Sequence, residues 1–468
     1  MKVRGLGEEI YFDEISITKS ANCHSVCNFK QRVAEENISV YKNAVGKKIS
    51  VELEGGRPIF FGEVVETVIE KTFRGSYAEI KAVSNSCKVD ETPETRIFQN
   101  PEKKFAEMLN PSRLNVSDCK IELDEKFSAK TCAEIILQDN ETAFEFMNRI
   151  AAWQSQRLWI IDTAENACKI KISSCADDSA NKISADDELR LKIGRRGKLN
   201  IANLTSAKYF ELGHILNFED SLQRFLIVAL KVYQENGVDR IDYELEEVKD
   251  ISPSELADSG IKKLSAKVVQ IKDDKNFGRV QVQFDIEDKD SKKTWLAYRS
   301  PYSGIIFLPE VGDSVEIFYS GGDCFVNSIL RTATLDAEVA KVEEKFIGNN
   351  RKQRILFREK SLELKSAETL IFMDDKKIIL SVGNNKITLD EGGITLKTDG
   401  ELKSEIAKNF SEKIGGEFKA DVAKNFSVKV GGDFISETAR DISLKSGGKF
   451  TAKASGAAQI GGSSVELG

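Results

Sequence analysis

An eight-residue repeat near the C-terminus restricts the fold more than any other feature of this sequence. Large apolar residues recur every eight residues, and Gly-Gly pairs begin at every second unit, at Gly415, Gly431 and Gly447. The recurring apolar residues are Phe410, Phe418, Phe426, Phe434, Ile442 and Phe450. Each unit joins a five-residue stretch of alternating apolar and polar residues to a three-residue turn, and alternation with a period of two is typical of a β-strand. The repeat therefore predicts strand and corner in regular succession.

One face of these strands is expected to be buried. The even positions of 410–454 carry mainly Phe, Val, Ile, Leu and Ala, whereas the odd positions within the five-residue stretches are polar except for Ile435. One unit cannot bury its own apolar side chains, so stacked units must supply the core. A single chain could coil with three units per turn, or three chains could wrap around a common axis, and the period fits both. An antiparallel meander fits less well because its loops rarely keep one spacing.

We predict that the apolar face of the repeat forms the axis of a stiff prism. The axis residues are Phe410, Ile414, Phe418, Val422, Phe426, Val428, Val430, Phe434, Ile442, Leu444 and Phe450. The corners of three residues leave no room for long loops, and almost all backbone groups would pair between strands. Such a rod suits a mechanical role better than a catalytic one.

Length and composition predict several globular domains ahead of the rod. A chain of 468 residues with 41% hydrophobic residues can build about three domains. The net charge of −7 is spread over 75 acids and 68 bases, without the clustered bases of a nucleic-acid surface. No apolar leader and no run of about 18 apolar residues occur, so we expect a protein made in the cytoplasm that spans no membrane. Eight scattered cysteines are expected to be reduced.

Changes of sequence period divide the chain into four predicted segments. They are a hub with two barrel-like subdomains and helical insertions (1–255), an OB-fold barrel (256–335), a connector (336–352) and a β-helical spike (353–468). Alternating runs dominate the hub, including one that predicts a strand over 208–213. Helical spacing appears over 101–109 and 142–153, and the second helix is preceded by Asp139 and Asn140 as candidate caps.

The barrel and the connector have their own patterns. About five short strands within roughly 70 residues, among them one over 304–308, predict a small Greek-key barrel of the OB type. The charged stretch 338–346 is expected to be a helical connector. Strands over 377–382 and 386–389 are expected to begin the rod.

The sequence contains little that could perform catalysis or bind a metal or cofactor. His24 and His214 are the only histidines, which leaves almost no material for a Ser-His-Asp or multi-histidine zinc site. Cys23, His24 and Cys27 lie close together in sequence, but no partner pair follows at zinc-finger spacing. We therefore predict no catalytic, cofactor or metal site, and a protein that is not an enzyme.

Several motifs resemble VgrG-type spike proteins of type VI secretion systems and the related hub-spike proteins of contractile phage tails and injection particles. The barrel motifs are 266–284, Trp295 and 307–317, and the hub motifs are 57–65, 96–100 and 144–150. The resemblance extends over essentially the whole chain. It implies a homotrimer whose three hubs adapt to a hexameric tube protein and to the baseplate, and whose C-terminal strands form a triple-stranded β-helix. It also implies piercing of the target membrane and delivery of effectors, with secretion or delivery into the target cell on firing.

The end of the rod departs from some members of this family. We expect it to carry neither metal-binding residues nor an additional effector domain, and its residues are small and apolar. We expect a separate PAAR-like tip protein to cap Ile460, Val465, Leu467 and Gly468. The alternative is a tail-associated β-helical enzyme that degrades polysaccharide, which predicts longer loops and a groove lined by carboxylates. A scaffold that carries an effector differs only in whether the tip binds cargo.

Overall fold

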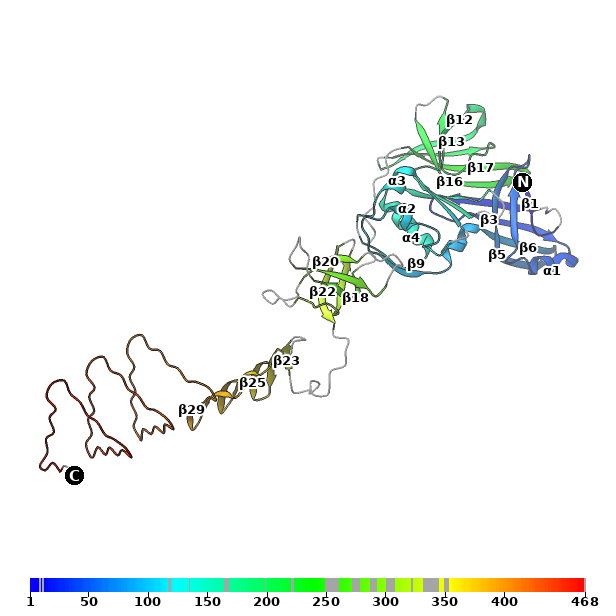
Figure 1. Ribbon diagram of the computed structural model, residues 1–468. Helices are drawn as coiled ribbons and strands as arrows, with labels where there is room; N and C mark the ends of the chain where they lie inside the picture. Colours follow the sequence, from blue (N-terminus) through cyan, green and yellow to red (C-terminus); the bar gives the residue numbers. More distant parts are fainter. Residues whose placement is uncertain are drawn as a thin grey trace. The chain divides into compact units, whose positions relative to one another are not determined.

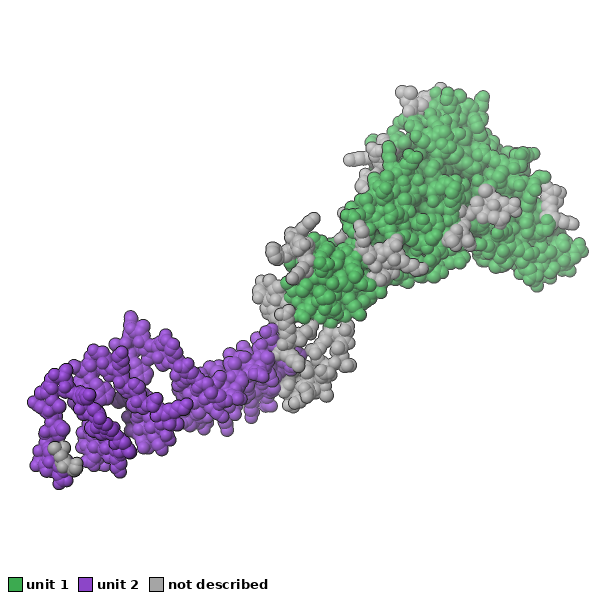
Figure 2. Space-filling view, in the orientation of Figure 1, with its two compact units in different colours: residues 1–336 green, residues 337–468 purple. Residues whose placement is uncertain are grey.

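The computed structural model describes most of residues 1–468. The residues outside the description are 8–9, 11, 117–118, 134, 164–167, 198, 220–222, 249–260, 272–277, 287–292, 300–307, 321–322, 331–344, 349–352 and 467–468. The chain divides into two compact units, 1–336 and 337–468, which Figure 2 colours separately. Strands outnumber helices throughout, which confirms the predicted mainly β class.

A twelve-stranded sheet forms most of the hub (Figure 1). Ten strands lie in the order β1-β4-β5-β6-β3-β2-β16-β17-β14-β13, with β15 beside β16 and β12 beside β15. Their bounds are β1 Lys2–Arg4, β2 Glu14–Ser20, β3 Val26–Val33, β4 Lys48–Glu52, β5 Pro58–Thr72, β6 Gly75–Ser84, β12 Asp177–Ile183, β13 Glu188–Arg196, β14 Leu199–Ser206, β15 His214–Phe218, β16 Arg224–Glu235 and β17 Val238–Glu247. Because β2 pairs with β16, the two ends of the hub sequence share one sheet.

Alternating residues determine which face of this sheet is buried. Along β3, Cys27, Phe29 and Val33 are buried while the residues between them are more exposed, apart from buried Gln31. The β4–β5 connection turns at Gly55 and Gly56, whose φ angles of 95° and 80° are readily adopted only by glycine. The same pattern continues through β16 and β17, so one hydrophobic core extends across both halves of the sheet.

Short helices and two small sheets form a second core in the hub. The helices are η1 Glu35–Asn37, α1 Ile38–Lys42, η2 Asn85–Asp90, α2 Phe105–Met108, α3 Glu125–Ala129, α4 Ala143–Trp153 and η3 Ala185–Asp187. The strands are β7 Glu94–Phe98, β8 Cys119–Leu123, β9 Ile136–Glu141, β10 Arg157–Ile161 and β11 Cys168–Ser173. Phe146 and Ile150 of α4 are fully buried in this core, as the helical spacing predicts.

Three local predictions for the hub are wrong. The first helix is shorter than 101–109 because Lys104 forms a β-bridge with Thr131 and only Phe105–Met108 is helical. The cap of α4 is neither Asp139 nor Asn140. Thr142 accepts a hydrogen bond from the Glu145 backbone, and the Glu145 side chain accepts one from the Thr142 backbone, which completes a capping box.

The third error is the strand predicted over 208–213. That segment forms a turn that leads into β15. Its alternation is misleading because Tyr209, Phe210 and Leu212 are all buried as anchors of the loop. The Phe210 backbone donates a hydrogen bond to the Tyr243 hydroxyl, which in turn donates to the Lys208 carbonyl. Side-chain anchoring therefore replaces the strand pairing expected here.

Five strands close into a small barrel at the end of the first unit. They are β18 Lys262–Gln270, β19 Arg279–Phe284, β20 Thr294–Tyr298, β21 Ser314–Ser320 and β22 Asp323–Leu330, and the barrel order is β18-β19-β20-β22-β21. Val268, Val282 and Ile317 are almost completely buried inside it. The strand predicted over 304–308 lies outside the described residues except for Leu308, which is in no strand.

The second unit begins with a seven-stranded antiparallel meander in chain order. Its strands are β23 Lys345–Gly348, β24 Arg354–Arg358, β25 Ser361–Ser366, β26 Thr369–Asp374, β27 Lys377–Val382, β28 Asn385–Asp390 and β29 Gly393–Lys397. Figure 1 shows them following one another along a narrow ribbon. The helical connector predicted over 338–346 lies mostly outside the described residues, but its last two residues belong to β23 and are not helical.

The chain changes character after Lys397. The described residues 398–466 contain no helix or strand, and Figure 1 draws them as an extended trace with repeated bends. Bends at 415–416, 423–424, 431–432, 439–440 and 447–448 coincide with the predicted corners. The stretches between the corners have no sheet partner in the single chain, so the β-helical prism remains a prediction.

Candidate assembly surfaces

The predicted axis residues are the largest exposed apolar surface of the C-terminal tail, residues 398–466. Phe410 is 71% exposed, Phe426 76% and Phe450 68%. The remaining eight are 44–74% exposed; they are Ile414, Phe418, Val422, Val428, Val430, Phe434, Ile442 and Leu444. A soluble monomer rarely leaves such a contiguous apolar stripe open, so a stripe of this size marks an interaction surface.

The backbone of the same tail is also unpaired. Among the described residues of 401–466, the hydrogen bonds present are local ones to side chains, such as Arg440 N to Thr438 Oγ1 and Gly448 N to Ser446 Oγ. A row of extended chain with open N–H and C=O groups is a template for pairing with another chain. The stripe and the backbone therefore lack partners over the same residues.

The predicted tip is described only in part. Ile460 is 79% exposed and Val465 is 52% exposed, whereas Leu467 and Gly468 lie outside the described residues. Both described side chains are apolar and open. The tip thus presents surface that a capping protein could cover.

A clasp between the barrel and the hub was not predicted from the sequence. The Tyr319 hydroxyl of β21 donates to the Ile135 carbonyl and accepts from the Leu137 N–H, both at 3.3 Å. Ile97 and Leu137 of the hub are buried in the same hydrophobic cluster as the barrel interior. A single tyrosine inside an alternating strand gives no indication that its hydroxyl reaches across a domain boundary.

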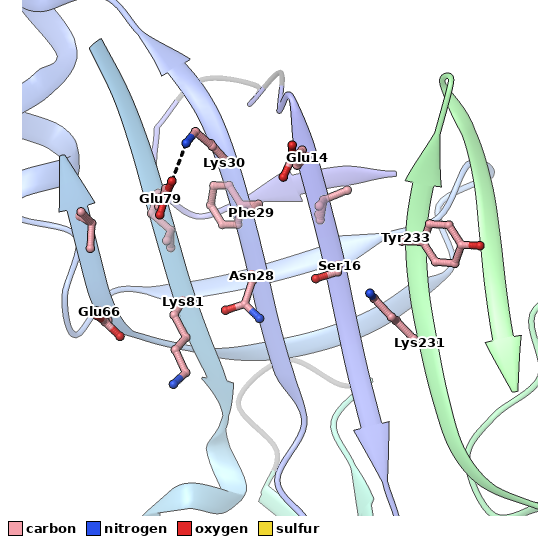
Figure 3. A pocket seen from close by; sticks show the side chains of 13 residues that line it. Glu14, Ser16, Asn28, Phe29, Lys30, Glu66, Glu79, Lys81, Lys231 and Tyr233 are labelled. Atoms are coloured by element: carbon pink, nitrogen blue, oxygen red, sulfur yellow. Dashed lines mark hydrogen bonds and ion pairs between the residues drawn. The ribbon is translucent and has the colours of Figure 1, made fainter. Parts of the chain in front are cut away.

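The polar face of the hub sheet contains a hollow of about 540 Å³ (Figure 3). Its charged lining residues are Glu14, Glu66, Glu79, Lys30, Lys81 and Lys231. The acids and bases are equal in number, and Lys30 pairs with Glu79 at 2.5 Å. A surface that binds nucleic acid or free phosphate needs an excess of positive charge, and this hollow does not supply one.

His24 takes part in the arrangement of described side chains that is most similar to a catalytic triad. Its Nδ1 lies 2.8 Å from Ser86 Oγ, its Nε2 lies 3.3 Å from Asp90 Oδ2, and its ring packs on Phe144. Nucleophilic catalysis needs a hydroxyl that substrate can reach, but Ser86 is only 1% exposed. Burial lowers the pKa of His24, with Asp90 acting in the opposite direction. The network joins the segment before β3 to η2 and the start of α4, and we interpret it as structural.

The described residues contain no group of three or more His, Cys, Asp or Glu side chains placed to hold a metal ion. Cys23 is exposed and Cys27 is buried, so these two neighbours of His24 do not converge.

Burial raises the pKa of the Cys132 thiol to about 11 and that of Cys324 to about 12. The expectation that all cysteines are reduced is wrong for Cys119, which is disulfide-bonded and lies opposite Cys168 in the parallel pair of β8 and β11.

A buried ion pair is the other unexpected feature of the hub. Lys19 Nζ lies 2.5 Å from Asp162 Oδ1, and both side chains are 2% exposed. Within the described part of the chain, Asp162 Oδ2 has no hydrogen-bond partner. The pair joins β2 to the segment after β10. An alternating strand predicts an apolar residue at position 19, so the sequence did not reveal it.

The barrel gives the first comparison with known proteins. Residues 264–327 match the family of the type VI secretion system/phage-baseplate injector OB domain. The match lies within the five-stranded closed barrel, so the barrel is an OB-fold. No curated protein matches the chain.

Two solved structures extend the comparison to the rest of the molecule. One is the E. coli c3393 protein, a component of the type VI secretion system with structural similarity to the T4 bacteriophage tail proteins gp27 and gp5. The TM-score is 0.51 at 11% identity, over 71% of this chain and 100% of that chain. The other is the half-lidded Francisella PdpA–VgrG complex, with a TM-score of 0.54 at 8% identity, over 84% of this chain and 85% of that chain.

These likenesses show that the chain has the fold of VgrG-type spike proteins. No described helix combines the length and the apolar character needed to cross a bilayer.

Proposed function

We propose that this protein is the trimeric central spike and hub of a contractile injection machine. The observation that carries the proposal is the tail, where an apolar stripe and an unpaired backbone coincide over 401–466. Three copies that share strands would cover the apolar stripe and pair the open backbone groups, because each chain would supply the partners that the others lack. The OB domain and the VgrG-like fold support the same role.

Each end of such a spike would bind its own partners. The hub joins the hexameric inner tube and the baseplate, and the tip around Ile460 and Val465 binds a PAAR-like cap or an effector. The similar Francisella VgrG forms a complex with PdpA, which supports a spike that carries a bound partner. The spike is made in the cytoplasm, pierces the target envelope on firing and has no catalytic activity of its own.

Sedimentation equilibrium of the intact chain tests the proposal directly. We expect one species of three times the 52.1 kDa chain mass across a hundredfold range of concentration. A monomer or a dimer over that range would contradict the proposal. Mixing the trimer with a candidate tip protein tests the cap separately. A trimer that binds no tip protein would contradict the proposed cap but not the proposed spike.

A further inference from the structure

The disulfide bond of Cys119 lies at an edge of the second hub core. Cys119 is the first residue of β8, and β8 is the outer strand of the sheet β10-β11-β8. The parallel register places Cys168, the first residue of β11, directly opposite it. The chain contains eight cysteines, and the remaining six are free thiols, so the partner of Cys119 is Cys168. The free thiols are Cys23, Cys27, Cys87, Cys132, Cys175 and Cys324.

Cys119 is the only fully buried residue of β8. It is 4% exposed, whereas the other four residues of the strand are half-buried or exposed. The neighbouring strand β11 buries Ile170 and Ile172 completely. A segment with few buried apolar contacts opens more easily than the rest of a domain, because little is lost when it opens. The attachment of β8 therefore depends most on the residue that carries the disulfide.

The other contacts that hold β8 to β11 are weak. The parallel ladder has five residue pairs, and parallel pairing is slightly less stable per residue than antiparallel pairing. Lys169 Nζ lies 2.9 Å from a carboxylate oxygen of Glu122, but both side chains are 32% exposed, and an ion pair open to water contributes little. Ile121 and Leu123 are only partly buried against the second core. Without the disulfide, the start of β8 is thus free to open.

The bond also closes a large covalent loop. Residues 119–168 contain α3, β9, α4 and β10, which contribute a large part of the second core. A cross-link lowers the conformational entropy of the unfolded chain, and this effect grows with the length of the loop. Oxidation should therefore stabilise the second core as a whole in addition to the start of β8.

We propose that Cys119 and Cys168 form a redox latch, which leaves the start of β8 free to open when both are thiols and fixes it when they are joined. The fold does not need the bond, because α4, β10 and β11 bury their own apolar residues in the second core. Burial also protects the bond once it has formed, since a reductant can reach it only when the edge of the sheet opens.

Closure of the latch is a thiol–disulfide exchange with a small-molecule disulfide as the oxidant. The thiolate of one cysteine attacks the small disulfide, forms a mixed disulfide and releases one small thiol. The thiolate of the other cysteine then attacks the cysteine sulfur of the mixed disulfide and releases a second small thiol. The protein loses two protons and two electrons, which end on the two small thiols.

The latch would stiffen the hub of the proposed spike outside the compartment in which it is made. Cytoplasmic thiol systems keep cysteines reduced, whereas oxidising spaces outside the cytoplasm allow disulfides to form. A hub assembled in the cytoplasm would therefore close its latch only after firing. This consequence rests on the proposed function, whereas the redox response of the purified chain does not depend on assembly.

Reduction and reoxidation of the full chain test the latch. The protein is reduced with dithiothreitol, freed of reductant and divided, and one half is treated with oxidised glutathione. Peptide mass spectrometry should find a cross-link between the peptides of Cys119 and Cys168 in the oxidised half alone. Hydrogen exchange of the amides of 120–123 should be roughly tenfold or more slower in that half, and exchange in β17 should be equal in both. A different partner for Cys119, equal exchange at 120–123 or an unfolded reduced half would overturn the latch.

Single variants separate the bond from the burial of a thiol. Cys119→Ala and Cys168→Ala each remove the bond, and Cys132→Ala is the matched control because Cys132 is a free thiol buried in the same core. Oxidised glutathione should no longer change exchange at 120–123 in the first two variants, and Cys132→Ala should keep the full response. Retention of the response in Cys119→Ala or Cys168→Ala, or its loss in Cys132→Ala, would overturn the latch.

Sedimentation of the reduced and oxidised chains distinguishes the latch from the proposed trimer. We expect the same trimer in both forms, because β8 belongs to the hub and not to the tail. A monomer with the full redox response would contradict the proposed function alone. A trimer without the response would contradict the latch alone.

Discussion

Phe426→Asp places a charge at the middle of the repeated apolar stripe. In a three-chain prism, Phe426 of each copy faces the axis, so one substitution introduces three carboxylates at one level of the rod. In the single chain this side chain is 76% exposed, so nearly all of its burial depends on assembly. We therefore expect the substitution to act on the proposed trimer and to leave the fold of the hub unchanged.

The size of the effect follows from that exposure. Complete burial of a Phe side chain is worth about 1.5–3 kcal/mol, so burial of the open three-quarters is worth about 1–2 kcal/mol per chain and roughly 3–7 kcal/mol per trimer. A buried unpaired carboxylate costs several kcal/mol more. Since each 1.4 kcal/mol is a factor of ten in an equilibrium constant, the lost burial alone weakens assembly by about two to five orders of magnitude.

The assay compares Phe426→Asp with Ser427→Asp in sedimentation and in SDS resistance on heating. Ser427 is the next residue on the predicted outer face of the same strand, so its variant adds the same charge where water can solvate it. We expect the first variant to lose SDS resistance and to dissociate at micromolar concentration, and the second to behave like the unmodified protein. A Phe426→Asp trimer that stays resistant to SDS and heat would refute the assignment of the stripe to the axis.

Three further predictions concern the first unit. Lys19→Met should lower the free energy of unfolding of the hub by about 3–5 kcal/mol in urea denaturation, because it leaves the Asp162 carboxylate buried without its cation. Tyr319→Phe should cost about 1–3 kcal/mol and speed amide exchange at 135–137, because two hydrogen bonds of the barrel clasp are lost. Cys132, whose pKa burial raises to about 11, should resist iodoacetamide at pH 8 while exposed Cys23 reacts, as peptide mass spectrometry can follow.

Each of these predictions has a contrasting outcome. Adding Asp162→Leu to Lys19→Met should restore most of the lost stability, and a double variant as unstable as the single one would show that the charge pair is not the cause. Unchanged exchange at 135–137 would mean that the apolar contacts alone hold the barrel to the hub. For Cys132, alkylation should accelerate as pH rises toward 11, since a raised pKa keeps the thiol protonated below that value, and equal rates for both cysteines at pH 8 would contradict the burial.

Local periodicity was sufficient to predict most elements of the fold. The barrel has five short strands, as its alternation predicted, although 304–308 is not established as one of them, and the helix Ala143–Trp153 lies where its apolar spacing placed it. The bends at 415–416, 431–432 and 447–448 also lie at the predicted Gly-Gly corners. Prediction succeeded where a local residue pattern allows only one secondary structure to bury its apolar side chains.

Prediction failed where a contact between distant residues decides the conformation. The loop over 208–213 alternates like a strand, yet the Tyr243 hydroxyl and buried aromatic anchors hold it as a turn. Lys19 occupies a core position of β2 only because Asp162, far away in sequence, meets it there. The hydrogen bonds of Tyr319 to the hub likewise join residues that are far apart in sequence. None of these partners is adjacent in sequence, so no local pattern could indicate them.

The two kinds of C-terminal sequence explain why strand pairing within the chain ends at Lys397. Upstream, tight turns such as Gly383-Asn384 let each strand fold back on the one before it, so pairing stays within the chain. Downstream, the corners of 410–454 keep the chain extended, and five-residue strands have nothing in their own chain to pair with. In the proposed trimer, the tail would therefore pair only with the tails of the other two copies, and no chain could separate there without breaking the pairing of the others.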